Sequence, residues 1–108
     1  MFNQGEKSDY REVLAGIRQK TLVWGEKTLL SEFHLNQGAV LPRHSHPHEQ
    51  TGYLVSGCLE LTIGDETARL GPGDSWCIPG DAGHNAFALE DSVAIEVFSP
   101  VRIDYLPS

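Results

Sequence analysis

Apolar and polar positions alternate in short runs along this chain, a pattern that predicts β-strands with one buried face. The run from Thr28 to Leu35 is a clear example, with Leu30, Glu32 and His34 on one face and Leu29, Ser31, Phe33 and Leu35 on the other. Tyr10 to Leu14 is expected to form a short helical turn or an edge strand. The other segments expected to form strands are Gly16 to Trp24, Tyr53 to Val55, Cys58 to Ile63, a short strand ending at Leu70, and Val93 to Phe98.

Gly- and Pro-containing turns separate these segments, and no stretch has helical periodicity. Many short strands with such turns indicate an all-β sandwich or barrel. The length of 108 residues is that of one small domain, which we expect to span residues 1–108 with a flexible N-terminus at 1–9. No apolar run is long enough to cross a bilayer and no signal peptide is recognisable, so we expect a cytoplasmic protein that does not bind membranes.

Charge and cysteine content exclude some functions. The formal net charge of −7 argues against nucleic acid as a partner, because nucleic-acid binding requires clustered Lys and Arg. It does not argue against a small anionic ligand, since a metal ion and one Arg can dominate the local field. Cys58 and Cys77 are expected to be free, buried thiols.

Three of the five histidines lie between two glycines in one short stretch, with a glutamine directly behind them. Imidazole nitrogens and an amide oxygen suit a divalent first-row metal ion. Because side chains alternate along a strand, His44 and His46 share one face, and Gln50 is expected to join them as a ligand. The bend expected at Pro47 makes the direction of His48 uncertain, so His48 is expected to support a ligand or to face outward.

A fourth protein ligand must come from elsewhere in the chain, and His84 is the candidate. Four neutral ligands leave positions open on a six-coordinate ion and leave its full positive charge to act on a bound molecule, which favours a Lewis-acid role. The donor set accommodates nickel, zinc, iron, manganese or cobalt, so the metal identity stays open. His34 is expected to be structural or solvent-facing, with pocket lining as the less favoured alternative.

The segment Val93 to Phe98 carries a carboxylate, Glu96, in a strand that is apolar on both faces. Burying it unpaired is costly, so it lies either at a solvated rim or near the metal with a raised pKa suited to proton transfer. Arg102 follows shortly after. It is expected to pair with Glu96, to hold a substrate carboxylate, or to be an ordinary surface residue. Spacing alone leaves these alternatives open.

Two motifs resemble those of the cupin family and together cover about half of the chain. The first comprises Gly38, His44, His46, Gln50 and Gly57, with Gln where the family usually has Glu. The second comprises Gly73, Pro79 and His84, with Asp81 and Ala88 in place of the usual Gly and Asn. The resemblance implies the cupin double-stranded β-helix, a jelly-roll barrel, with one divalent metal ion at His44, His46, Gln50 and His84.

The C-terminal segment is similar to that of the KdgF family of small cupins, which act in pectin and alginate breakdown. Their pattern Asp-x-Phe-x3-Arg corresponds here to Glu96, Phe98 and Arg102, with Glu in place of Asp. The resemblance implies a metal-dependent enzyme that converts unsaturated uronate monosaccharides to linear ketonised sugars. Glu96 would move the proton, Phe98 would pack on the sugar, and Arg102 would hold the sugar acid or tune Glu96.

Other functions fit the same metal motif. One is a cupin dioxygenase that acts on another small substrate, and another is a cupin that binds a metal or a sugar without catalysis; a sugar isomerase is a weaker alternative. We also expect a homodimer, because the side chains of Leu29, Phe33, Val93 and Ile95 are expected to give the barrel an apolar outer face.

Overall fold

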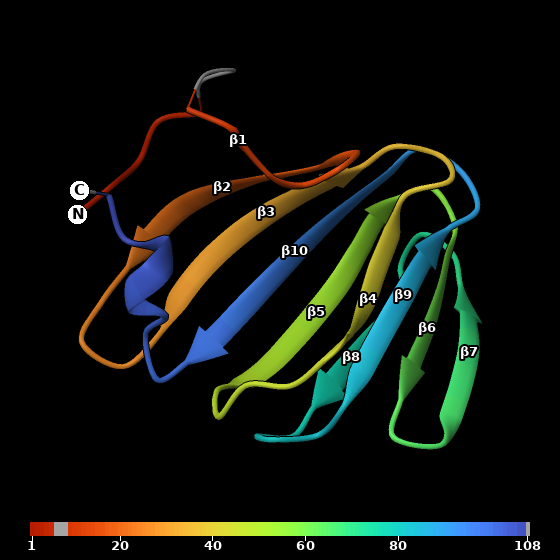
Figure 1. Cartoon of the computed structure of the whole chain (residues 1–108). Coiled ribbons are helices and arrows are strands. Elements are labelled where there is room, and N and C mark those ends of the chain that lie inside the picture. The colour runs from red at the N-terminus through yellow and green to blue at the C-terminus, as the bar shows by residue number, and fades with distance from the viewer. Residues whose placement is uncertain (6–8, 108) are drawn as a thin grey trace.

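The computed structural model of the chain describes residues 1–5 and 9–107. Within these residues the strands form two antiparallel sheets that make two layers, as Figure 1 shows. This is the predicted all-β jelly-roll barrel. Residues 6–8 of the segment expected to be flexible lie outside the described residues.

The larger sheet has six strands in the order β1-β2-β3-β10-β5-β8, and the smaller has four in the order β4-β9-β6-β7. The strands of the larger sheet are β1 (Arg11–Leu14), β2 (Ile17–Trp24), β3 (Leu29–Leu35), β10 (Ser92–Ser99), β5 (Glu49–Ser56) and β8 (Ser75–Ile78). Those of the smaller sheet are β4 (Val40–His44), β9 (His84–Ala88), β6 (Leu59–Ile63) and β7 (Glu66–Leu70). A single 3₁₀ turn of the described chain, η1 (Ile103–Tyr105), follows the last strand.

Strand β10 lies near the middle of the larger sheet, between β3 and β5. Its burial alternates at every residue, so that Ser92, Ala94, Glu96 and Phe98 face the interior. Neighbouring strands on both sides satisfy its backbone, and side-chain donors on β5 and β8 satisfy the polar side chain that it carries to the inside of the barrel. Glu96 therefore lies inside the barrel, and not at a solvated rim.

The segment that begins at Tyr10 forms an edge strand, the second of the two expected alternatives, because β1 pairs only with β2. Strand β4, which contains Pro42, is also an edge strand. Proline has no backbone N–H to donate, and an edge strand tolerates this because one of its sides has no neighbouring strand to bond. The register of β4 against β9 shifts between Leu41 and His44, and this shift sets the position of His44.

The expected outer face was partly wrong. Leu29 is fully buried and Phe33 lines the internal cavity, because both lie on the inward face of β3. Val93 and Ile95 do lie on the outer face, alternating with the buried residues of β10. The homodimer stays a prediction.

The hydrophobic core and the candidate site occupy different levels of the barrel. Ala88, at the C-terminal end of β9, belongs to the core cluster, whereas His84 begins the same strand. Both cysteines are free, as expected, but neither is buried: Cys58 is half-buried, and Cys77 is exposed because it faces away from Trp76 and Ile78 on β8. The described residues contain no helix long and apolar enough to cross a membrane.

Gly57 closes the turn between β5 and β6 at a point where the chain passes close to the start of β10. Its φ is 95°, and an added Cβ would lie 2.2 Å from Ser92 Oγ and 2.4 Å from the Asp91 carbonyl oxygen. Ser92 Oγ cannot move away without cost, because it accepts a hydrogen bond from the Cys58 backbone N–H at 3.1 Å. This position therefore requires glycine for its conformation and for space.

Replacing Gly57 with Ala should lower the free energy of unfolding by about 2 kcal/mol or more, through backbone strain together with the steric clash. Gly64 is the matched control, because its φ of 59° is also positive but an added Cβ would meet nothing within 4 Å. Gly64→Ala should cost only about 1 kcal/mol. Urea unfolding of both variants measures the difference, and equal losses would contradict the clash.

Candidate functional site

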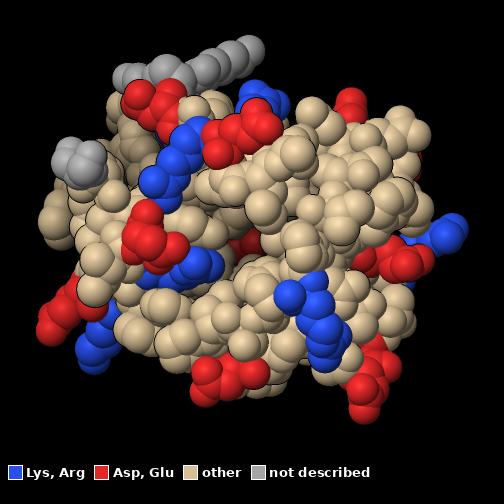
Figure 2. Space-filling model, in the orientation of Figure 1, with Lys and Arg blue, Asp and Glu red and all other residues tan. Residues whose placement is uncertain are grey.

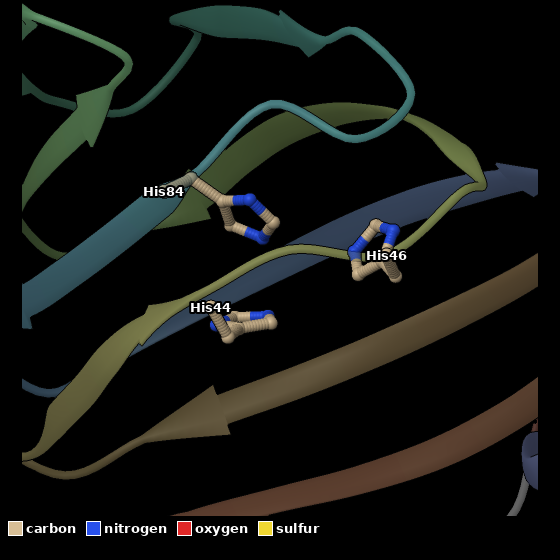
Figure 3. A group of neighbouring side chains, drawn as sticks. All are labelled: His44, His46 and His84. Atoms are coloured by element: carbon tan, nitrogen blue, oxygen red, sulfur yellow. The ribbon is translucent and has the colours of Figure 1, made fainter.

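Three imidazoles converge at the candidate site, with His84 buried, His46 half-buried and His44 exposed. His44 ends β4, His46 lies two residues later in the following loop, and His84 begins β9 directly opposite His44. Figure 3 shows the three rings turned toward a common point. One nitrogen from each ring lies within 4.8 Å of the corresponding nitrogens of the other two. The pairing of β4 with β9 thus brings residues 40 positions apart in sequence into one cluster.

Backbone carbonyls fix the orientation of each ring. Nδ1 of His44 lies 2.9 Å from the Pro42 oxygen, Nδ1 of His46 lies 3.0 Å from the His48 oxygen, and Nδ1 of His84 lies 3.0 Å from the Ala82 oxygen. A carbonyl oxygen only accepts hydrogen bonds, so each Nδ1 carries the proton. In the neutral rings all three Nε2 atoms are then unprotonated and offer lone pairs.

Burial favours the neutral form of two of these rings. It lowers the pKa of His46, with a further contribution from the positive charge of Arg102. Burial also lowers the pKa of His84. The Nε2 atom of His84 is buried and has no hydrogen-bond partner among the described residues. A buried acceptor without a partner is unusual in a folded protein, and a bound cation would satisfy it.

Gln50 supplies a fourth donor atom. Its Oε1 lies 3.0 Å from His46 Nε2, and its Nε2 donates a hydrogen bond of 2.5 Å to Glu96 Oε1. This second bond fixes the amide, so two lone-pair atoms, Gln50 Oε1 and His46 Nε2, face each other. Their contact is repulsive unless a positive ion lies between them. The donor set of three imidazoles and one amide oxygen fits a divalent first-row metal ion.

The structure brings together all four ligands proposed from the sequence. Among the described residues, the cluster of converging nitrogens comprises His44, His46 and His84, and the ring of His48 packs edge-on against that of His46, with centroids 5.6 Å apart. The backbone oxygen of His48 orients His46. His34 has structural contacts instead: its Nε2 lies 2.7 Å from Glu32 Oε1, and its ring packs edge-on against Tyr10.

Two donors hold the Glu96 carboxylate. Oε1 accepts the hydrogen bond from Gln50 and another of 3.0 Å from the indole N–H of Trp76. The other oxygen, Oε2, has no hydrogen-bond partner among the described residues. It is not among their fully buried unpaired atoms, so it retains some exposed surface. Because Glu96 lines the cavity, Oε2 is the oxygen that a ligand can reach. Burial raises the pKa of Glu96, although both hydrogen bonds and the charge of Arg102 oppose this shift.

Gly52 makes the contact between Trp76 and Glu96 possible. The three residues lie side by side on β8, β5 and β10, with Gly52 in the middle. An added Cβ on Gly52 would lie 2.1 Å from Cε2 of the indole. The indole therefore lies flat across the strand, over the glycine, and reaches the carboxylate on the far side.

Arg102 does not pair directly with Glu96 as one alternative proposed. Its Nη2 and Nε donate hydrogen bonds of 2.8 and 3.2 Å to Asp104. The guanidinium lies over the ring of Tyr105, 4.1 Å from its centroid, and 5.2 Å from the centroid of Phe98. These contacts hold Arg102 at the cavity wall. Its Nη1 takes no part in the two hydrogen bonds to the Asp104 carboxylate.

The site opens into a cavity of about 570 Å³. At its wall, Arg11 of β1 donates a 2.7 Å hydrogen bond to the backbone carbonyl oxygen of Asp104. Outside the cavity lining, Thr21 of β2 donates one of 2.5 Å to the backbone carbonyl oxygen of Tyr105. The first strand thus contacts the C-terminal turn beside the cavity. Figure 2 shows this face of the molecule hollowed at its centre, with basic and acidic side chains around the hollow.

The site also contains four residues that sequence patterns did not predict: Trp76, Asp104, Tyr105 and Arg11. One signal for Trp76 was available, because a glycine in the middle of a strand often marks a close approach of another group, and Gly52 has that position. The contacts of Arg11 and Asp104 join residues 93 positions apart, and no local pattern indicates them.

Comparison with known proteins agrees with this geometry. Residues 31–99 match the cupin domain family. The pectin degradation protein KdgF of Dickeya dadantii (strain 3937) is 31% identical over 103 residues, which cover 94% of each chain.

Two solved structures superpose closely on the chain. KdgF from a Halomonas species has a TM-score of 0.92 at 36% identity, covering 98% of each chain. An RmlC-like cupin from Shewanella frigidimarina NCIMB 400 has a TM-score of 0.91 at 26% identity, covering 97% of this chain and 95% of that one. This chain therefore belongs to the cupin family and, within it, to the KdgF family.

Proposed function

We propose that this protein is an enzyme that converts unsaturated uronate monosaccharides to linear ketonised sugars, in the breakdown of polyuronates such as pectin. The observation that carries the proposal is the position of Glu96. It is a buried carboxyl group with one oxygen free toward the cavity, hydrogen-bonded to a candidate metal ligand, Gln50. The likeness to KdgF of Dickeya dadantii, which is named a pectin degradation protein, supports the substrate class.

The candidate ligands of the divalent metal ion are His44, His46, Gln50 and His84. When bound, the ion would supply Lewis-acid stabilisation of negative charge that develops on substrate oxygens. The amide of Gln50 would place Glu96 beside this charge, because the same side chain contacts both. Arg102, with Nη1 available, would bind the substrate carboxylate and fix the orientation of the sugar.

Glu96 would carry the proton in the reaction. Opening of the unsaturated ring gives an enol, which becomes a ketone when carbon gains a proton and the enol oxygen loses one. Oε2 faces the cavity and would exchange the proton, while Oε1 stays held by Gln50 and Trp76. Phe98, 1% exposed on the same strand, would pack on the sugar and exclude water.

The direct test is the ultraviolet absorbance of an unsaturated galacturonate or guluronate monomer mixed with protein loaded with nickel, zinc, iron, manganese or cobalt. The ring double bond absorbs, and ketonisation removes it, so we expect a decay well above the spontaneous rate with at least one metal. Absence of acceleration with every metal would contradict the proposal and favour a non-enzymatic binding protein or an oxygenase.

Replacing Glu96 with Gln should reduce turnover by about 100-fold or more while metal binding is kept, because the amide cannot exchange the proton. Glu60→Gln is the matched control, since Glu60 is exposed on β6 and should have no effect. Initial rates and metal content of both variants give the comparison. Turnover that is unimpaired in the Glu96 variant would remove Glu96 from the mechanism.

Replacing His84 with Ala should weaken metal binding by more than about 100-fold, since loss of groups that merely orient a ligand already costs about 10- to 100-fold. His34→Ala is the control, because His34 pairs with Glu32 and contacts none of the candidate ligands. Calorimetric titration with nickel measures both affinities. Equal affinities in the two variants would place the metal elsewhere.

A further inference from the structure

A second arginine, Arg11, lines the cavity of the candidate site together with Arg102. Both guanidinium groups lie against the ring of Tyr105, with that of Arg11 5.6 Å from the ring centroid. Both also contact Asp104, but through different atoms. The Asp104 carboxylate accepts the hydrogen bonds of Arg102, whereas its backbone carbonyl oxygen accepts the bond from Nη2 of Arg11. The two cations therefore lie at one part of the cavity wall.

No carboxylate among the described residues forms an ion pair with Arg11, whereas Arg102 is paired with Asp104. The Nε of Arg11 donates a hydrogen bond of 3.2 Å to Gln19 Oε1, so both acceptors that Arg11 uses are uncharged. The neighbouring Glu12 lines the cavity without pairing with it. The third nitrogen of Arg11, Nη1, takes no part in these bonds. The guanidinium can therefore form charge-assisted hydrogen bonds with an anion that enters the cavity.

A buried polar network holds Arg11 in this position. Gln19 is 1% exposed, and its amide nitrogen donates hydrogen bonds of 2.7 Å to Ser31 Oγ and 3.0 Å to Thr21 Oγ1. These two bonds turn the amide oxygen of Gln19 toward Arg11. Thr21 in turn donates to the backbone oxygen of Tyr105. Polar side chains are costly inside a barrel, and here their bonds fix the guanidinium against the C-terminal turn before any ligand binds.

We propose that Arg11 is a further binding residue for the anionic group of the substrate, and that it makes the cavity selective for sugar acids over neutral sugars. The inference rests on the proposed function for the identity of the ligand as a uronate. The Asp104 carboxylate partly neutralises Arg102 and fixes its direction, whereas Arg11 would supply the positive charge that no carboxylate compensates. Arg11 lies on β1, far in sequence from the C-terminal pattern that contains Arg102.

The test compares galacturonate, a uronate without the ring double bond, with the neutral sugar galactose, by calorimetric titration of the nickel-loaded full-length protein. Galacturonate should bind more tightly than galactose, and added salt should weaken its binding alone. Arg11→Gln should lower the affinity for galacturonate by about fivefold, a modest loss because Arg11 is exposed at the cavity wall, and leave galactose binding unchanged. Arg11→Lys keeps the charge and should restore part of this loss.

Arg69→Gln is the matched control, because it removes the same charge from an exposed position on β7 that does not line the cavity. Equal affinities for galacturonate in the Arg11→Gln and Arg69→Gln proteins would overturn the proposal. Galacturonate that binds no more tightly than galactose, or does not bind, would also overturn it, as would an equal loss for both sugars in Arg11→Gln, which indicates a merely structural role. Binding is measured without turnover, so this test and the absorbance assay can fail separately.

Discussion

A polar group inside an apolar barrel needs a hydrogen-bond partner. The Gln50 amide is such a partner for the Glu96 carboxylate, and it also contacts the candidate metal ligand His46. Its N–H donates to Glu96, and its oxygen consequently faces His46. The usual Glu of the first cupin motif would here bring a second carboxylate to within 2.5 Å of Glu96. Two like charges at that distance repel strongly. Gln at position 50 and Glu at position 96 are therefore physically linked.

Much of this arrangement follows from short-range patterns in the sequence. Alternation of apolar and polar residues predicted which side chains of β3 and β10 share a face, because a strand has only two faces. Alternation also placed His44 and His46 on one face, whereas His84 was proposed from the need for a further ligand and from the resemblance to the second cupin motif. Local patterns succeed where one strand determines the direction of its own side chains.

Features that depend on contacts between distant segments were not predicted. The partner of Arg102 was also left open by spacing, and it is the 3₁₀ turn after β10 that brings Asp104, two residues away, to its guanidinium. Leu29 and Phe33 were assigned to the same outer face as Val93, although the antiparallel pairing of β3 with β10 turns them inward. Which face of a strand is buried depends on the opposite sheet, and a single segment does not contain that information.

The glycine in the middle of β5 has a consequence for efforts to stabilise this protein. Gly52 is a poor residue for a strand, and a scheme that ranks substitutions by strand propensity would replace it with valine. The added side chain would occupy the space of the Trp76 indole, 2.1 Å from where its first carbon would lie, and would displace the donor that holds Glu96. The foreseeable product is a less stable barrel with a misaligned acid, because the gain in strand propensity is smaller than the cost of the clash. Thermostability screens should leave this position untouched.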